Sequence, residues 1–195
     1  MNEQNDATEA DDNVSSTTES QSLSERERLD LLKWVLDNVQ SQIRFADSKA
    51  SFVLFFHIFL FSFITSQAET LASVPHEARG WIFVLRGLLF AVYAVLAIVS
   101  IGYAVSAVIP RFGVNADMSK IFFGHIVAGY ERNVHEYNKA ISQMSKSEWL
   151  KDVSGQIVEN SNIAQTKHKR ARTAALWALA SVVLAFFGVL LSLVA

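Results

Sequence analysis

The sequence predicts an all-α membrane protein, with three transmembrane helices that are continuous with a cytoplasmic helical bundle. The 195-residue chain is 51% hydrophobic with a mean hydropathy of +0.24, and its apolar residues gather in three long runs. It holds 2 Pro and 8 Gly, a low number that favours long uninterrupted helices over turn-rich β structure. A chain of this length has no core large enough to bury three such runs, so we expect them to lie in a lipid bilayer.

The composition also restricts the chemistry of the protein. The chain contains no Cys, which excludes disulfides, thiolate catalysis and Cys-ligated metal sites. Its formal net charge is −2, so no strong overall field draws it to nucleic acid, and we expect no nucleic-acid partner. The N-terminus lacks the basic-then-apolar pattern of a signal peptide, so we expect the first hydrophobic run to be retained as a signal anchor.

Two polar segments precede the first apolar run. Residues 1–21 are acidic, without basic or aromatic residues, and cannot bury enough apolar area to offset their ordering entropy, which predicts a disordered acidic tail. In residues 22–49 apolar residues recur at steps of three and four, which predicts a cytoplasmic amphipathic helix. Either of two pairs fits a capping box at its start, Ser24 with Glu27 or Ser22 with Glu25.

Three segments are predicted to cross the bilayer. Their bounds are 50–66, 81–109 and 174–195, and the first two are joined by an external loop over 67–80. The first span gives about 26 Å of helix, the short end of a spanning length. No Gly or Pro separates it from the helix before it, so one helix is expected to start in water and continue into lipid. Two small-xxx-small pairs predict close helix approach, Gly102 with Ser106 and Gly188 with Ser192.

Residues 110–173 are predicted to form a cytoplasmic helical segment. Most basic residues lie in this segment and in residues 26–49, so the positive-inside rule places the N-terminus in the cytoplasm and the C-terminus outside. An apolar stripe over residues 119–144 predicts one helix. Ser145 with Glu148 predicts the cap of the next helix, which continues without a break into the third span. A rearrangement below the membrane must therefore move helices inside it.

The sequence contains none of the catalytic and metal-binding motifs we considered. A Gly-rich phosphate loop, H-E-x-x-H, a His-Asp dipeptide and G-x-S-x-G are all absent. His125 and His135 share the predicted helix, but their spacing argues against a metal site formed by this pair. We therefore expect no enzyme, no metal ion and no cofactor.

Two polar features lie on or beside the first span. His57 lies in the middle of the span, where a charged group is costly, so it is either a functional group or a neutral side chain that hydrogen-bonds to another helix. Arg44, Asp47 and Lys49 directly precede the span, and Arg44 and Asp47 are neighbours on one helical face. They form either the water-side collar of a membrane helix or a basic fork that binds an anion, with Asp47 orienting it.

The stretches "RFADSKAS", "IPRF", "IFFGHI" and "GQIVENSNIAQTKHKRARTAALWAL" together resemble the Pycsar effector family (PycTM), the transmembrane effectors of bacterial pyrimidine-cyclase antiphage systems. The resemblance covers about residues 27–194. The positions that match the family pattern are Arg44, Ala46, Asp47, Lys49 and Ala50; Phe122, Phe123 and Gly124; and Asn160, Ser161, Ile163 and Lys167.

The resemblance implies a multi-pass protein of the bacterial inner membrane, with a periplasmic C-terminus, that serves antiviral defence. A partner uridylate or cytidylate cyclase would make cyclic UMP or cyclic CMP, and the effector would respond by impairing the membrane, which causes cell death and abortive infection. We also expect a homo-oligomer. The alternatives are a membrane effector of another nucleotide-signalling defence system, or a helical scaffold or interaction protein without a ligand.

A cyclic mononucleotide carries one phosphate charge and a flat base, so its site needs a basic group, a stacking surface and a few polar contacts. The candidate ligand-binding residues are Arg44, Asp47, Lys49, Phe122, Phe123, Tyr130, Asn160 and Lys167, with His57 as the candidate functional residue in the membrane.

Overall fold

The computed structural model describes residues 23–66, 80–110 and 119–194, and within these residues it contains five helices and no strand. The helices are α1 (Glu25–Ser66), α3 (Trp81–Val108), α4 (Phe123–Tyr130), α5 (Val134–Ser142) and α6 (Lys146–Val194). Three of them, α1, α3 and α6, are long and apolar enough to cross a membrane. The predicted all-α fold with three long apolar helices is confirmed. The predicted tail over 1–21 and all but Gly80 of the predicted loop over 67–80 lie outside the described residues.

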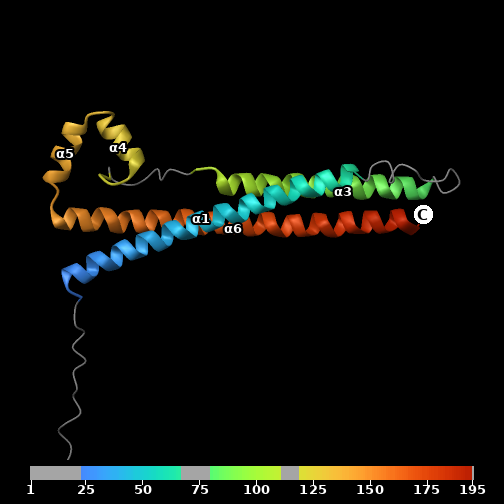
Figure 1. Ribbon diagram of the computed structural model, residues 1–195, viewed down its shortest axis with the longest axis horizontal. Coiled ribbons are helices and arrows are strands. Elements are labelled where there is room, and N and C mark those ends of the chain that lie inside the picture. The colour runs from blue at the N-terminus through green and yellow to red at the C-terminus, as the bar shows by residue number, and fades with distance from the viewer. Residues whose placement is uncertain (1–22, 67–79, 111–118, 195) are drawn as a thin grey trace, which may run out of the picture.

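The three long helices lie against one another along their apolar halves (Figure 1). α3 packs most extensively on α6 and runs antiparallel to it, while α1 crosses both at an angle. α6 has 49 residues, about 74 Å of helix, so it extends far beyond the end of α3. The polar half of α1 extends to the same side, and α4 and α5 fold beside the first turns of α6. We call the polar halves of α1 and α6, residues 25–49 and 146–173, the arms.

The apolar halves place small residues inside and large ones outside. The interhelical seam contains the buried residues Ala50, Val53, Ala104, Ala107, Ala171, Ala174 and Ala178. Phe52 and Phe55 are each 71% exposed on the outer face of α1, and Phe59 is 68% exposed. Close packing of small residues, surrounded by large apolar side chains, is the arrangement expected of helices in lipid, because lipid solvates the outer side chains while backbones approach closely inside.

Alanines, rather than glycines, make this close approach. Gly102 is exposed, and a Cβ added at Gly102 or at Gly188 would meet nothing within 4 Å. The prediction that these glycines bring the helices of the chain together is therefore wrong. Ala at the seam gives nearly the same closeness and favours the helix more strongly than Gly does.

The predicted single helix over 119–144 is also wrong, because the chain breaks into α4 and α5 at Glu131. This residue has a positive φ of 46°, a backbone conformation that sequence propensity assigns to Gly or Asn, so nothing in the sequence indicated the break. The rings of Tyr130 and Tyr137 lie 5.2 Å apart edge to face and pack the two short helices together. His125 and His135 consequently lie on different helices.

Both helix starts that were predicted from capping boxes, those of α1 and α6, are confirmed. The Glu27 carboxylate accepts from the Ser24 backbone N–H at 2.8 Å, and the Ser24 hydroxyl accepts from the Glu27 N–H at 3.4 Å. Ser145 and Glu148 make the same reciprocal pair at 2.9 and 3.2 Å. The alternative that uses Ser22 lies outside the described residues.

Candidate functional site

A largely buried ion pair between the long helices lies where α1 crosses α6, at the end of α3. Lys167 Nζ on α6 lies 2.5 Å from Asp47 Oδ1 on α1. The Lys167 side chain is only 5% exposed, whereas Asp47 is 35% exposed, so the ammonium depends on its partners and the carboxylate still reaches water. Lys167 Nζ also donates to the backbone oxygen of Val108, the last residue of α3, at 3.4 Å.

A second cation reinforces the end of α3. The Arg170 guanidinium on α6 donates to the backbone oxygen of Ser106 at 3.1 Å. The last carbonyls of a helix have no intrahelical partner and carry the negative end of its dipole, so cations are favoured there. Asp47, Lys167, Arg170 and the end of α3 thus join three helices at one level, and we call this group the crossing lock.

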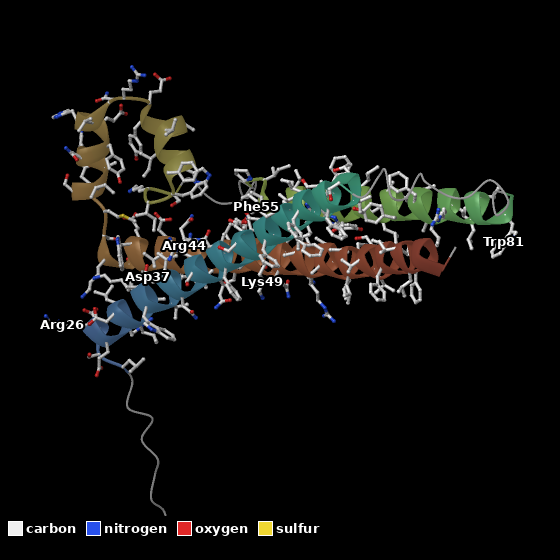
Figure 2. The ribbon with its side chains drawn as sticks, turned by 45° about the vertical axis from the view of Figure 1, so that its right-hand side comes forward. Arg26, Asp37, Arg44, Lys49, Phe55 and Trp81 are labelled. Carbon is white, nitrogen blue, oxygen red and sulfur yellow. The ribbon has the colours of Figure 1, made fainter. Side chains whose placement is uncertain are left out.

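The structure gives Asp47 a partner on another helix rather than Arg44, the neighbour predicted for it on the same helical face. Asp47 pairs with Lys167 rather than with Arg44, which is exposed on the outer face of α1. Lys49 Nζ lies 4.1 Å from the centre of the Phe45 ring, a cation–π contact within α1. Figure 2 shows Arg44 and Lys49 in sequence along α1, before Phe55 in its apolar half. The collar interpretation therefore fits Lys49, whereas Asp47 belongs to the crossing lock.

A second polar chain links the same three helices inside the apolar part. His57 Nε2 lies 2.8 Å from Ser100 Oγ, and Ser100 Oγ donates to the backbone oxygen of Ala174 at 2.8 Å. Because the one Ser100 proton is used in that bond, His57 Nε2 is the donor to Ser100. His57 is 4% exposed, and its Nδ1 has no hydrogen-bond partner among the described residues. Of the two interpretations of His57, the hydrogen bond to a neighbouring helix is present.

The aromatic candidates lie elsewhere, near the start of α6, far from its apolar half. Phe122 stacks near Phe123 and His125, with ring centres 5.0 and 5.1 Å away. This segment is attached to α6 through the backbone N–H of Lys120, which donates to Asp152 Oδ2 at 2.9 Å.

The predicted ligand-binding residues do not converge on one site. Asp152 and Lys167 are separated along α6 by fifteen residues, about 22 Å of helix, more than a mononucleotide spans. The structure brings Asp47 and Lys167 together, but it places Phe122, Phe123 and Tyr130 at a different level of the molecule. Asn160 is half-buried on α6 between the two levels. As ligand contacts these residues remain predictions.

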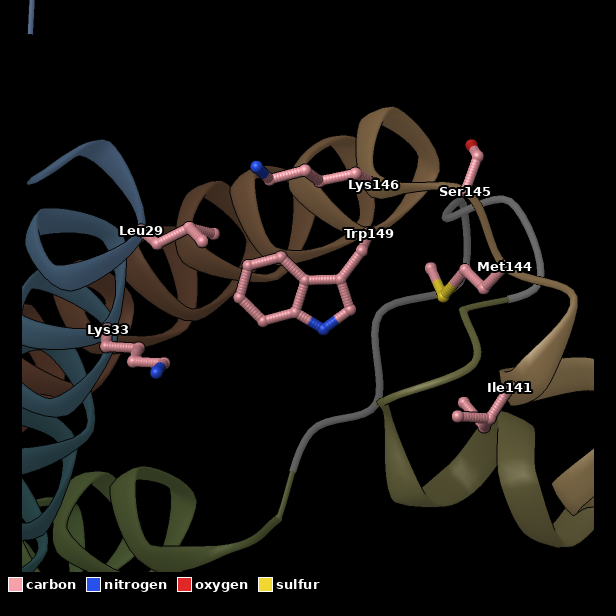
Figure 3. Close-up of a pocket in the computed structure, with 7 residues that line it drawn as sticks. All are labelled: Leu29, Lys33, Ile141, Met144, Ser145, Lys146 and Trp149. Carbon is pink, nitrogen blue, oxygen red and sulfur yellow. The ribbon is translucent and has the colours of Figure 1, made fainter. Parts of the chain in front are cut away.

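Within the described residues, a cavity lies between the outer ends of the arms, which are the first turns of α1 and α6. The sequence did not predict it. It has a volume of about 380 Å³. Trp149 of α6 and Lys33 of α1 line it, together with Lys146 at the start of α6 (Figure 3). In the sequence, Trp149 is an apolar residue of the helix predicted to begin at Ser145. Since the cavity joins α1, α5 and α6, no local pattern indicates it.

One ion pair crosses the same end of the arms. Lys146 Nζ pairs with the Glu25 carboxylate at the start of α1. The hydrogen bond from Lys146, and then its positive charge, hold the pKa of Glu25 below its ordinary value of 4.5. Both side chains are exposed, so the pair is open to competition from other anions. In the described residues no group of three or more His, Asp or Glu side chains is placed to hold a metal ion.

Together, the apolar seam, the crossing lock and the long arms define a helical membrane protein in which the polar arms and the membrane part share single helices. The family model described as Pycsar effector protein domain, PycTM, matches residues 31–194. The chain belongs to this family, which confirms the resemblance seen in the sequence. Neither the curated proteins nor the solved structures contain a match to the chain.

Membership identifies the chain as a Pycsar transmembrane effector, a membrane protein of antiviral defence. PycTM is not a known enzyme family, and it implies a partner system that produces a cyclic nucleotide.

Proposed function

We propose that the protein is the killing component of a Pycsar antiphage system in the bacterial inner membrane. A cyclic pyrimidine nucleotide, cyclic UMP or cyclic CMP, made by a partner cyclase, activates it. The activated protein impairs the membrane, and the cell dies before phage is released. The cytoplasmic part senses the nucleotide, and the three spans deliver the effect.

The observation that carries this proposal is the continuity of α1 and α6. Each helix runs without a break from a cytoplasmic arm into an apolar half, over 42 residues in α1 and 49 residues in α6. A change in the angle or spacing of the arms is therefore transmitted directly to the spans. The crossing lock is the point about which such a change turns, because it ties both arms to the end of α3.

A nucleotide shifts the protein toward the active arrangement only by binding that arrangement more tightly than the resting one. Within the described residues, the seam of one chain is filled by buried alanines and serines. A single three-helix unit of this kind offers no path for ions along its axis. We therefore propose that several copies assemble, and that the lesion forms between or around them.

Dye release from liposomes tests this function. Purified protein in vesicles that hold a self-quenched dye is exposed separately to cyclic UMP, cyclic CMP, cyclic AMP and cyclic GMP. We expect release with a cyclic pyrimidine nucleotide and little with the purine nucleotides. Absence of release with all four would contradict the proposal.

A substitution at Gly155 tests whether the continuity of α6 matters. Pro at this position removes a helix hydrogen bond and clashes with the preceding turn, so Gly155→Pro bends α6 within its arm, before the crossing lock at Lys167, at a cost of about 3 kcal/mol. Gly155→Ala is the matched control, because an added Cβ there meets nothing within 4 Å. We expect the Pro variant to bind nucleotide without dye release and the Ala variant to behave as wild type.

The proposed orientation has the N-terminus in the cytoplasm and the C-terminus in the periplasm. Because the chain contains no Cys, single introduced cysteines report their own side of the membrane. We expect a membrane-impermeant maleimide to label Ser66→Cys in intact spheroplasts and to label Ser142→Cys only after lysis. The reverse pattern would invert the topology.

A further inference from the structure

We propose that the cavity lined by Trp149, Lys33 and Lys146 is a binding site for a small planar ring that carries one phosphate charge. This inference rests on the proposed function in one respect, since it takes cyclic UMP and cyclic CMP as the ligands of that class. It places the sensor at the outer ends of the arms rather than at the border of the membrane.

The size and lining of the cavity fit a ligand with one ring system. Its volume of about 380 Å³ lies at the lower end of the range for small-molecule sites, which suits a mononucleotide better than a dinucleotide. Trp149 offers an aromatic face on which a base can stack. Leu29, Ile141 and Met144 provide apolar surface around it, as the close-up in Figure 3 shows.

The charges fit a ligand with a single negative charge. Lys33 and Lys146 supply two ammonium groups, and Glu25, paired with Lys146, supplies one carboxylate, so these three side chains sum to a charge of about +1 at neutral pH. The start of α6 adds little, because Ser145 and Glu148 already satisfy each other there. A phosphate is therefore held by the two lysines.

The position of the cavity gives the ligand a mechanical effect. Leu29 and Lys33 belong to α1, Trp149 belongs to α6, and Met144 lies in the connection from α5 to α6. A ligand that contacts all three segments joins the arms beyond the crossing lock. Its phosphate competes with the Glu25 carboxylate for Lys146, so binding exchanges a direct contact between the arms for one through the ligand.

Calorimetric titration of the full-length protein in nanodiscs tests the site. The probes are cyclic UMP, cyclic CMP, uridine as the ring without phosphate, inorganic phosphate, and a cyclic dinucleotide with two bases. We expect a cyclic pyrimidine mononucleotide to bind, and the other three probes to bind at least about tenfold more weakly. Uridine lacks the phosphate charge, inorganic phosphate lacks the ring, and the dinucleotide is too large for the cavity.

Substitutions assign the contacts. We expect Trp149→Ala to weaken binding about tenfold or more through the lost stacking, and Trp149→Phe to restore most of it. Lys33→Gln changes an exposed side chain that is not needed for folding, and we expect about tenfold weaker binding with a shallower salt dependence. Trp34→Ala and Lys139→Gln are the matched controls, because both residues are exposed on cytoplasmic helices outside the cavity.

The outcomes separate the site from the function. Wild-type binding that persists in Trp149→Ala and Lys33→Gln, but is lost in Arg44→Gln, would overturn this site in favour of the membrane border and leave the proposed function intact. Binding that depends on Trp149 and Lys33 without dye release would support the site and contradict the function. No binding of either cyclic pyrimidine nucleotide by the wild type would overturn both.

Discussion

The apolar halves of α1, α3 and α6 pack along a continuous seam, whereas the arms are held together at separate points. In the membrane part, Ala50, Ala104 and Ala174 are each 0% exposed, and the chain from His57 to Ala174 links all three helices. In the described part of the arms, buried side chains such as Val153 and Ala164 are fewer, and they lie beside one exposed ion pair, a few hydrogen bonds and an open cavity. The two regions are built from the same helices but differ in how they resist rearrangement.

This difference indicates how one chain can be both a durable membrane anchor and a responsive sensor. A close-packed seam moves as a unit, because separating the helices would leave voids along their whole length. Contacts at separate points can be exchanged one at a time, each at a small cost. The crossing lock lies at the boundary between the two regions.

The largest loss of stability is expected when the carboxylate of the crossing lock, Asp47, is removed. Asp47→Asn leaves the Lys167 ammonium, 5% exposed, without its counter-charge, and we expect a loss of stability of about 2–4 kcal/mol. Unfolding in mixed detergent micelles measures the loss. Asp37→Asn, an exposed residue on the same helix, is the control. Adding Lys167→Met to the variant should recover part of the loss. Equal losses of stability in Asp47→Asn and Asp37→Asn would show that the pair of Asp47 and Lys167 does not stabilise the crossing of α1 and α6.

A larger residue in the seam should disturb the membrane part more than any equivalent change on its surface. Ala174→Leu inserts three carbons at a site that is 0% exposed, and we expect a cost of about 1–3 kcal/mol in the same unfolding assay. Ala175→Leu places the same side chain on the exposed neighbouring position and should be nearly neutral. Similar costs for the two variants would mean that the seam is not closely packed.

Loss of the Ser100 hydroxyl should have a smaller effect. Ser100→Ala leaves both His57 Nε2 and the Ala174 carbonyl without their shared partner, and we expect about 1 kcal/mol of destabilisation, as for other hydrogen bonds between membrane helices. Ser62→Ala is the control, because that hydroxyl bonds within its own helix, to Ile58. A neutral result for Ser100→Ala would show that the seam alone holds the three helices.

The smallest effect is expected when a lower pH protonates Glu25 at the outer ends of the arms. The folded-state pKa of Glu25 lies below 4.5 because of Lys146, so the pair contributes above pH 4.5 and is lost as the pH falls through the folded-state pKa. We expect the distance between spin labels on the two arms to increase or broaden in that range. Glu25→Gln should give the broadened distance already at neutral pH. A distance unchanged by either treatment would show that the pair does not hold the arms.

Much of this fold could be predicted because its signals are local. Capping boxes, long apolar runs and the scarcity of Gly and Pro each act within a few residues, and they predicted the long helices and the capped starts of α1 and α6. The break at Glu131 could not be predicted, because propensity does not indicate a positive φ at a Glu residue, and the contact of Tyr130 with Tyr137 across the break forms only when the chain turns there.

The candidate site was harder to predict, because its partners are distant in sequence. Helix spacing suggested Arg44 as the neighbour of Asp47, but the angle at which α1 crosses α6 brings Lys167 to it instead. The cavity at Trp149 likewise requires the relative positions of three segments. Spacing along one helix contains no information on the angle between two helices.

The uninterrupted course of α6 also fixes the phase between its two ends. Each residue of an α-helix turns the chain by about 100°, so one residue inserted between Trp149 and Lys167 would rotate the cavity wall by that angle relative to the membrane span. Seven inserted residues would nearly restore the original direction, while moving the two ends about 10 Å further apart. The length of this segment is therefore expected to vary among relatives in steps close to whole turns. An insertion or deletion there would preserve the angle between the two ends of α6, whereas a free loop would tolerate any length.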